Sequence, residues 1–292
     1  MRTITSRKRL IWLGALLLLW LLCSGMVVGH LGGSAQAAEG LPLRDRLQQF
    51  PAWTTRPPVS AAEGDLIYPN GFLGRWQVTT RLVDLAAPLA PDVVTPGFEG
   101  NRDYLGEPIT FEARFVRGSG KPRSASWPVP LPLPRRQLSV VADRAFNGLN
   151  LTRAYLEQKM PGQGDLVQQI KVDPNNPNRQ VTLMKDVRSQ EPSPSRSLEA
   201  TITGRASEIP TPEQFITSEV FQQVFRGLPQ PYLNEVESTT AYQCAGPCAE
   251  APATITADQA TAIYLSPQDP DFFKAGSTPV ALYRYEMVFE RL

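Results

Sequence analysis

The amino-acid sequence predicts an all-β protein, a single antiparallel up-and-down barrel of about eight to ten strands with one short internal helix. Three observations support this fold class. Segments in which apolar and polar side chains alternate follow one another from residue 76 to residue 291. Clusters of Gly, Pro, Asn and Asp separate these segments, which favours direct antiparallel connections. Residues 143–158 alone show a convincing helical rhythm.

The first two predicted strands show the alternation most clearly. Residues 76–84 and 107–117 each place apolar or β-branched side chains on one face and polar side chains on the other. A period of two is typical of a half-buried strand. The inward positions are Trp76, Val78, Thr80 and Leu82 in one strand and Ile109, Phe111, Ala113 and Phe115 in the other.

A third strand and the helix follow. Residues 137–142 are predicted as a strand, Asp143 is placed to cap the next helix, and Pro161 is placed to end it. The six further strands that we consider clearest are predicted over residues 166–172, 179–188, 197–207, 234–243, 253–265 and 278–291.

Residues 211–226 fit two interpretations. Pro212 at a first helical position, inside a capping-box pattern, is a good helix start. The Phe, Val and Thr residues that follow are mostly strand formers. We expect a strand over residues 215–225.

Residues 1–37 have the three parts of a signal peptide. Four basic residues precede an uncharged apolar stretch over residues 10–31, and Ala35 and Ala37 fit the small positions of a cleavage site before Ala38. The alternative is an uncleaved anchor, because the apolar stretch is long enough to cross a membrane. In either case the sequence predicts an exported domain.

The composition excludes several chemistries once this leader is set aside. His30, the single histidine, and Cys23 both lie within the leader. Without them, Ser-His-Asp and Cys-His catalysis, His-ligated zinc and axial-His haem are excluded. The leader holds four of the 29 basic residues and none of the 28 acidic ones, so the net charge changes from +1 to −3. We therefore expect no nucleic acid partner, and we expect no metal or cofactor.

The two remaining cysteines, Cys244 and Cys248, flank a turn made by Gly246 and Pro247. In an exported protein, such neighbours most simply form a disulfide. The alternatives are a redox pair or half of a metal site, although the C-x3-C spacing differs from that of thioredoxin-like motifs.

The chain before residue 68 is predicted to be a Pro-rich N-terminal arm over residues 38–67, with a short amphipathic helix within residues 41–50. We expect this arm either to pack on the body or to stay mobile. Residues 88–106 and 118–136 form two more Pro-rich segments, which are interpreted as rigid connectors or as docking sites.

The triplet Gly74-Arg75-Trp76 stands on the first strand after a Pro-containing arm. Here the chain resembles a calycin, since lipocalins and their relatives carry G-x-W at this point. The resemblance implies a lipocalin-like barrel closed by Gly74 and Trp76. It also implies a basic partner for the tryptophan on the last strand, for which Arg284 and Arg291 are available.

Short stretches spread over most of the chain from residue 68 onward carry a second resemblance. They are residues 68–76, 141–147, 217–219, 236–242 and 279–285. In them the chain resembles an uncharacterised family of exported proteins in cyanobacteria, with relatives in plant chloroplasts. The resemblance implies a periplasmic or thylakoid-lumen location. It supplies no activity and so no catalytic residue.

A barrel of this size can enclose one apolar ligand if its inward side chains leave room. We therefore expect a small hydrophobic ligand, such as a lipid or a pigment. The alternative is that the same side chains fill the barrel. The candidate cavity-wall residues are Trp76, Phe111, Phe115, Tyr242, Tyr283 and Tyr285.

Two other functions are weaker on sequence grounds. Glu235 and Glu237 share one strand face and Asp143 adjoins Arg144, but paired charges alone are unspecific, so no enzyme and no catalytic residue are predicted. The second function is that of an accessory or assembly factor, which docks through its Pro-rich segments on a membrane complex, such as a photosynthetic one.

Overall fold

The computed structural model describes residues 42–95, 97–118, 138–185, 196–227 and 231–292. The predicted leader and its cleavage site lie outside the described residues, as does nearly all of the Pro-rich segment over residues 118–136. Within the described ranges, no helix is long and apolar enough to cross a membrane.

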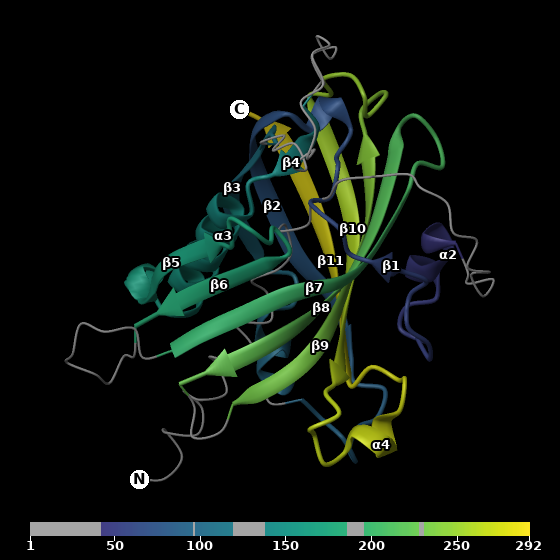
Figure 1. Cartoon of the computed structure of the whole chain (residues 1–292), viewed down its shortest axis with the longest axis vertical. Coiled ribbons are helices and arrows are strands. Elements are labelled where there is room, and N and C mark those ends of the chain that lie inside the picture. The colour runs from purple at the N-terminus through teal and green to yellow at the C-terminus, as the bar shows by residue number, and fades with distance from the viewer. Residues whose placement is uncertain (1–41, 96, 119–137, 186–195, 228–230) are drawn as a thin grey trace, which may run out of the picture.

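One antiparallel sheet, curled into a half-barrel, forms the body of the protein (Figure 1). Its strands are β2 Gly74–Ala86, β3 Pro108–Arg117, β4 Val140–Ala142, β5 Val167–Val172, β6 Arg179–Met184, β7 Arg196–Glu208, β8 Gln214–Arg226, β9 Tyr232–Cys244, β10 Thr254–Leu265 and β11 Ala281–Arg291. Their spatial order is β4-β3-β2-β11-β10-β9-β8-β7-β6-β5, which confirms the predicted up-and-down sheet.

The inward faces predicted for the first two strands share one core. Val78 lies opposite Phe111 on β3 and opposite Phe289 on β11, so the three side chains point the same way. Phe289 in turn faces Ile255 on β10. The alternation of apolar and polar residues therefore predicted correctly which side chains of these strands point to the concave side.

The ambiguous segment forms β8, as expected. Phe215, Phe221 and Phe225 are buried on the concave side. β8 pairs along its length with both β7 and β9. A central strand buries both of its faces, so the aromatic and β-branched residues outweigh the local helix-start signal.

The helices are few and short. The predicted internal helix is α3 Arg144–Lys159, and the Asp143 carboxylate caps it by accepting from the Phe146 N–H at 3.1 Å. α3 packs against β3 and β5 and covers the open side of the half-barrel (Figure 1). The other helical segments are α2 Leu43–Gln48, α4 Phe272–Ala275 and the 3₁₀ turns η2 Asn70–Phe72, η3 Glu99–Tyr104 and η4 Gly164–Leu166.

The two ends of the strand order, β4 and β5, are joined by α3, and a second segment crosses the gap between the edges. The two-residue strand β1 (Ser60–Ala61) pairs with β7. Seven residues after Ala61, Tyr68 forms a bridge to Val140 of β4. Leu66 and Tyr68 of this segment are buried in the core. The chain before β2 thus links the two sides of the half-barrel.

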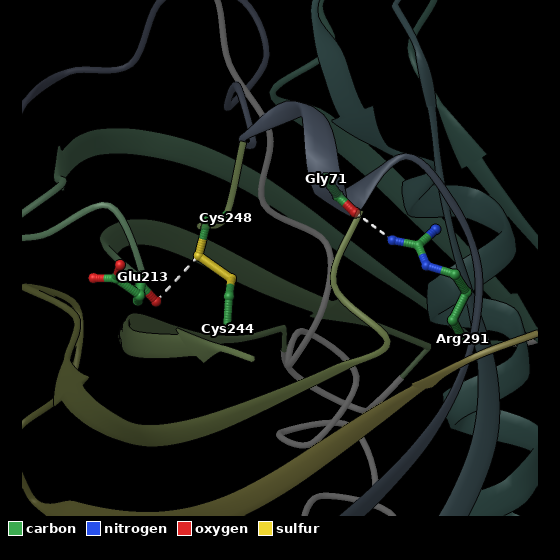
Figure 2. Close-up of a disulfide and its surroundings, with 5 residues drawn as sticks. All are labelled: Gly71, Glu213, Cys244, Cys248 and Arg291. Carbon is green, nitrogen blue, oxygen red and sulfur yellow. Dashed lines mark hydrogen bonds between the residues drawn. A yellow bond between two sulfur atoms is a disulfide. The ribbon is translucent and has the colours of Figure 1, made fainter. Parts of the chain in front are cut away.

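A disulfide and an arginine hold the end of the half-barrel where β2 begins (Figure 2). Cys244 and Cys248 are bonded, which confirms the predicted disulfide. The Cys248 carbonyl accepts from the Gly71 N–H at 3.0 Å. Arg291 donates to the carbonyl oxygens of Leu73 at 2.9 Å and Gly71 at 2.5 Å. The turn before β2 is therefore tied to both the disulfide loop and the last strand.

Gly71 allows two backbones to approach closely at this point. A Cβ on Gly71 would lie 1.5 Å from the Glu250 carbonyl oxygen, whereas a Cβ on Gly100 would meet nothing within 4 Å.

We expect Gly71→Ala to lower the free energy of unfolding by more than about 2 kcal/mol, because a backbone must move. Gly100→Ala should leave it unchanged or slightly higher. Urea denaturation measures both, and equal midpoints would contradict the close approach.

Candidate functional site

The six predicted cavity-wall residues all face the concave side of the sheet. None is more than 6% exposed, and all belong to the main hydrophobic core. They divide into two groups. One group packs at the end of the half-barrel that the disulfide holds, and the other lies near α3.

At the disulfide end, aromatic rings pack closely on one another. Phe115 contacts Tyr68 with ring centroids 4.7 Å apart, and Tyr242 contacts Phe72 with centroids 5.3 Å apart. Phe215 lies beside the same rings. Burial raises the pKa of the Tyr242 hydroxyl above its ordinary value of 10. Phe115 and Tyr242 therefore fill this end and do not line an open space there.

Near α3, Tyr285 borders a small internal pocket of about 20 Å³, which holds roughly one water molecule. Thr80, Tyr155 and Lys159 also line it. Tyr283 lies further along β11, and its hydroxyl accepts from the Asn101 side-chain amide at 3.2 Å.

The predicted closing residues are only partly brought together. The Arg291 guanidinium lies 4.2 Å from the centre of the Trp76 ring, and a Cβ on Gly74 would lie 3.1 Å from Arg291 Nη1. Arg284 lies on the opposite face of β11, where it donates to both carboxylate oxygens of Asp258 at 3.0 and 2.6 Å. Of the two arginines offered by the sequence, Arg291 contacts the tryptophan.

A row of amide side chains, which the sequence alone did not predict, crosses the concave face. Gln180 on β6 faces Ala200 on β7, which faces Gln223 on β8, which faces Asn234 on β9. The three amides are 0–2% exposed. Neither polar atom of Gln180 or of Gln223 has a hydrogen-bond partner among the described residues. Asn234 lies beside the Tyr232 hydroxyl, whose pKa burial raises to about 12.

This row bears on function because burial of an unpaired amide is costly, at about 1–3 kcal/mol for each unsatisfied group. In the sequence, Gln180 and Gln223 occupy inward positions of ordinary strands. Only their register with Ala200 places them in one row. A signal was nevertheless available: polar residues at positions where the alternation calls for apolar ones.

Four charged side chains lie at the crossing segment. Arg205 Nε donates to Glu219 Oε1 at 2.5 Å, and Arg144 Nη2 lies 3.8 Å from the same oxygen. Arg144 Nε lies 3.8 Å from Asp65 Oδ1. Burial raises the pKa of Asp65, and Arg144 opposes that effect. Two guanidinium groups thus face two carboxyl groups, and the cluster is close to electrically neutral.

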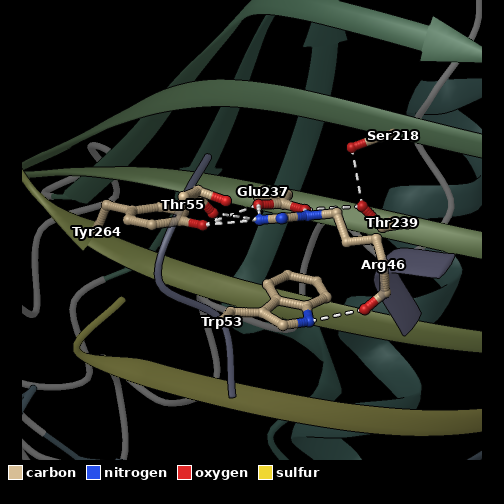
Figure 3. A network of polar contacts seen from close by, with 7 residues as sticks. All are labelled: Arg46, Trp53, Thr55, Ser218, Glu237, Thr239 and Tyr264. Carbon is tan, nitrogen blue, oxygen red and sulfur yellow. Dashed lines mark hydrogen bonds and ion pairs between the residues drawn. The ribbon is translucent and has the colours of Figure 1, made fainter. Parts of the chain in front are cut away.

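On the convex face, the arm forms a second buried network (Figure 3). Arg46 of α2 donates to Glu237 Oε2 at 2.6 Å, and Tyr264 donates to the same oxygen at 2.9 Å. The Arg46 guanidinium lies 4.0 Å from the centre of the Trp53 ring. Arg46 is 5% exposed and Glu237 is 0% exposed. The described part of the arm therefore packs on the body, which is one of the two expected outcomes.

The two glutamates noted in the sequence both form ion pairs with arginines of the arm. Glu237 is paired with Arg46, and Glu235 pairs with Arg56, also from the arm. Both glutamates lie on the convex face, away from the half-barrel interior. Beside α2 this face also holds an open groove of about 580 Å³. Its lining includes Arg44 and Gln48 of α2, Ile216 and Ala241 on the sheet, and Val288 of β11.

The Pro-rich loop before β3 also packs inward. Phe98 is fully buried and contacts the Tyr283 ring with centroids 5.7 Å apart. Val93 is buried in the same core. The described part of this loop therefore has a structural role at the end of the half-barrel opposite the disulfide.

These features define a class of protein: a disulfide-containing antiparallel half-barrel with a buried polar row on its concave face. A search of curated proteins and a search of solved structures gave no match. The model of a domain of unknown function, DUF6816, matches residues 60–292. The chain belongs to this family. The match agrees with the expectation of an uncharacterised domain family, and it begins after most of the arm.

The first prediction for this region concerns the buried Arg46–Glu237 pair. Arg46→Met should lower the free energy of unfolding by about 3–5 kcal/mol, because it leaves a buried carboxylate without its counter-ion. Combining it with Glu237→Met should restore much of that loss. Arg44→Met, on the same helix but well exposed, is the control. Urea denaturation of the wild type, the single variants Arg46→Met and Glu237→Met, the double variant and the control measures the coupling, and additive effects would contradict a direct buried pair.

The second prediction concerns Lys159 and the pH dependence of the free energy of unfolding. Burial lowers the pKa of its amino group from 10.5 to about 6. Between these values the unfolded chain binds the proton and the folded chain does not, so this group makes stability rise with pH. Lys159→Met should therefore stabilise the protein at pH 7, and the gain should shrink towards pH 10.

The measurement for Lys159 is chemical denaturation at intervals between pH 6 and pH 10. Lys171→Met is the control, because Lys171 is an exposed lysine on β5. A gain from Lys159→Met that is constant or grows with pH would show that its amino group is not buried in its neutral form.

Proposed function

We propose that this protein is an exported binding protein, which holds one small, mainly apolar molecule such as a lipid or a pigment within its half-barrel. The observation that carries the proposal is the pair of amides, Gln180 and Gln223, which are buried on the concave face without a hydrogen-bond partner among the described residues. Buried polar groups in proteins are almost always hydrogen-bonded. A bound molecule with a polar group would supply the missing partners.

The surroundings of the amide row fit an amphipathic ligand. On one side of the row, the neighbouring inward residues on β7, β8 and β9 are Ile202, Phe221 and Val236. On the other side, Leu198 and Phe225 lie between Thr182 of β6 and Tyr232 of β9. A polar group at the row would therefore have apolar side chains on both sides. This arrangement of a few polar groups in an apolar wall is characteristic of small-molecule sites.

Two features support an exported location. The Cys244–Cys248 disulfide is of the kind that persists in oxidising compartments. The leader predicted from the sequence would direct the domain there. A periplasm or thylakoid lumen is the compartment we propose. The proposal is for binding without catalysis, because the glutamates noted in the sequence pair with arginines of the arm.

The test is native mass spectrometry of the full chain purified gently from its source. We expect a mass above that of the polypeptide, with the excess released when the same sample is denatured. We also expect at least one compound from a panel of lipids and pigments to raise the melting temperature. A ligand-free mass together with no stabilisation by the panel would overturn the proposal.

A further inference from the structure

We infer that the group recognised at the amide row is uncharged and both donates and accepts hydrogen bonds, as a carboxamide or a lactam does. This inference rests on the proposed function and narrows the class of ligand. It excludes molecules whose buried polar group is an ionised carboxylate or phosphate.

The first argument is the chemistry of the row itself. A glutamine side chain offers two N–H donors and one carbonyl acceptor. Gln180 and Gln223 leave both kinds of atom without a partner in the described part of the chain. A carboxylate would satisfy the donors and leave both carbonyl oxygens unpaired, whereas an amide satisfies donors and acceptors together.

The second argument is spatial. Ala200 lies directly between Gln180 and Gln223 in the cross-strand row, and it is buried. Directly opposed residues on neighbouring strands lie about 5 Å apart, so the two glutamines stand about 10 Å apart across the small alanine. Because the intervening alanine side chain is short, a single planar amide group between the two long side chains would reach both.

The third argument concerns charge. The row contains amides and apolar residues, with Asn234 and Leu265 continuing it on β9 and β10. Further along the inward face of β7 lie Arg196, two residues before Leu198, and Arg205, which pairs with Glu219 beside Arg144 and Asp65. An ionised ligand group at the row would face amide dipoles and no charged side chain of the row itself, and a buried unpaired charge is strongly disfavoured.

The experiment compares two probes with the same chain, oleamide and oleate, on the full-length protein at pH 8. Isothermal titration calorimetry and the shift in melting temperature measure binding. We expect oleamide to bind at least about tenfold more tightly than oleate. Equal or tighter binding of oleate would overturn the inference but leave the proposed function standing.

Two adjacent glutamines on β8 supply a matched pair of variants. Gln223 points inward and is fully buried, and Gln222 is exposed on the other face. We expect Gln223→Leu to weaken oleamide binding about tenfold, and Gln222→Leu to leave it unchanged. Unchanged binding in Gln223→Leu would place the recognised group elsewhere and overturn the inference. If Gln223→Leu does not fold, the wild-type preference between the two probes still decides.

The remaining outcomes separate the two proposals. If neither probe binds but native mass spectrometry releases a molecule with an uncharged amide, lactam or similar group, both proposals are supported. If the released molecule has an ionised group held at Gln223, binding stands and the inference fails. If nothing is released and no probe binds, the amides are satisfied by trapped water, and both proposals fail.

Discussion

A sheet that does not close must cover two edges, and in this protein those edges are β4 and β5. An uncovered edge exposes unpaired backbone groups and invites association with other chains. α3 joins the two edges and packs against β3 and β5, and the crossing segment pairs first with β7 and then with β4. The placement of α3, the buried Tyr68 and the charged cluster around Arg144 follow from this need.

The crossing explains why charged residues lie so deep in the molecule. Arg144 is the first residue of α3, Asp65 belongs to the crossing segment, and Arg205 and Glu219 are neighbours on β7 and β8. α3 and the crossing segment meet the paired strands β7 and β8 here, and ion pairs join the side chains of all four elements. Breaking such a buried pair is costly, although its net contribution relative to apolar packing is small. The cluster therefore acts mainly to fix how these elements meet.

The fold was predictable because its strands follow a strict alternation over long runs, as in β3 and β11. β8 was predictable only from its Phe and Val content, since Pro212 and Glu213 suggest a helix. The disulfide follows from a local motif and was predicted, whereas the calycin resemblance offered both Arg284 and Arg291 as partners of Trp76, and the structure selects Arg291. The amide row was missed because it depends on the register of four strands, which a single sequence does not specify. Glu237 was noted but placed on neither face, because its partner Arg46 lies 191 residues away in the chain.

The arm has a practical consequence for defining the domain. The family match begins at residue 60, whereas Arg46 and Trp53 come earlier. A boundary drawn at the match would separate a buried carboxylate from its counter-ion. It would also uncover Ala260, Ala262, Tyr264 and Leu282, which pack under the arm. The folding unit is therefore longer than the region that the family model matches. A fragment trimmed to residues 60–292 would expose an apolar surface prone to association, and the Glu237 carboxylate within it would lack its counter-ion.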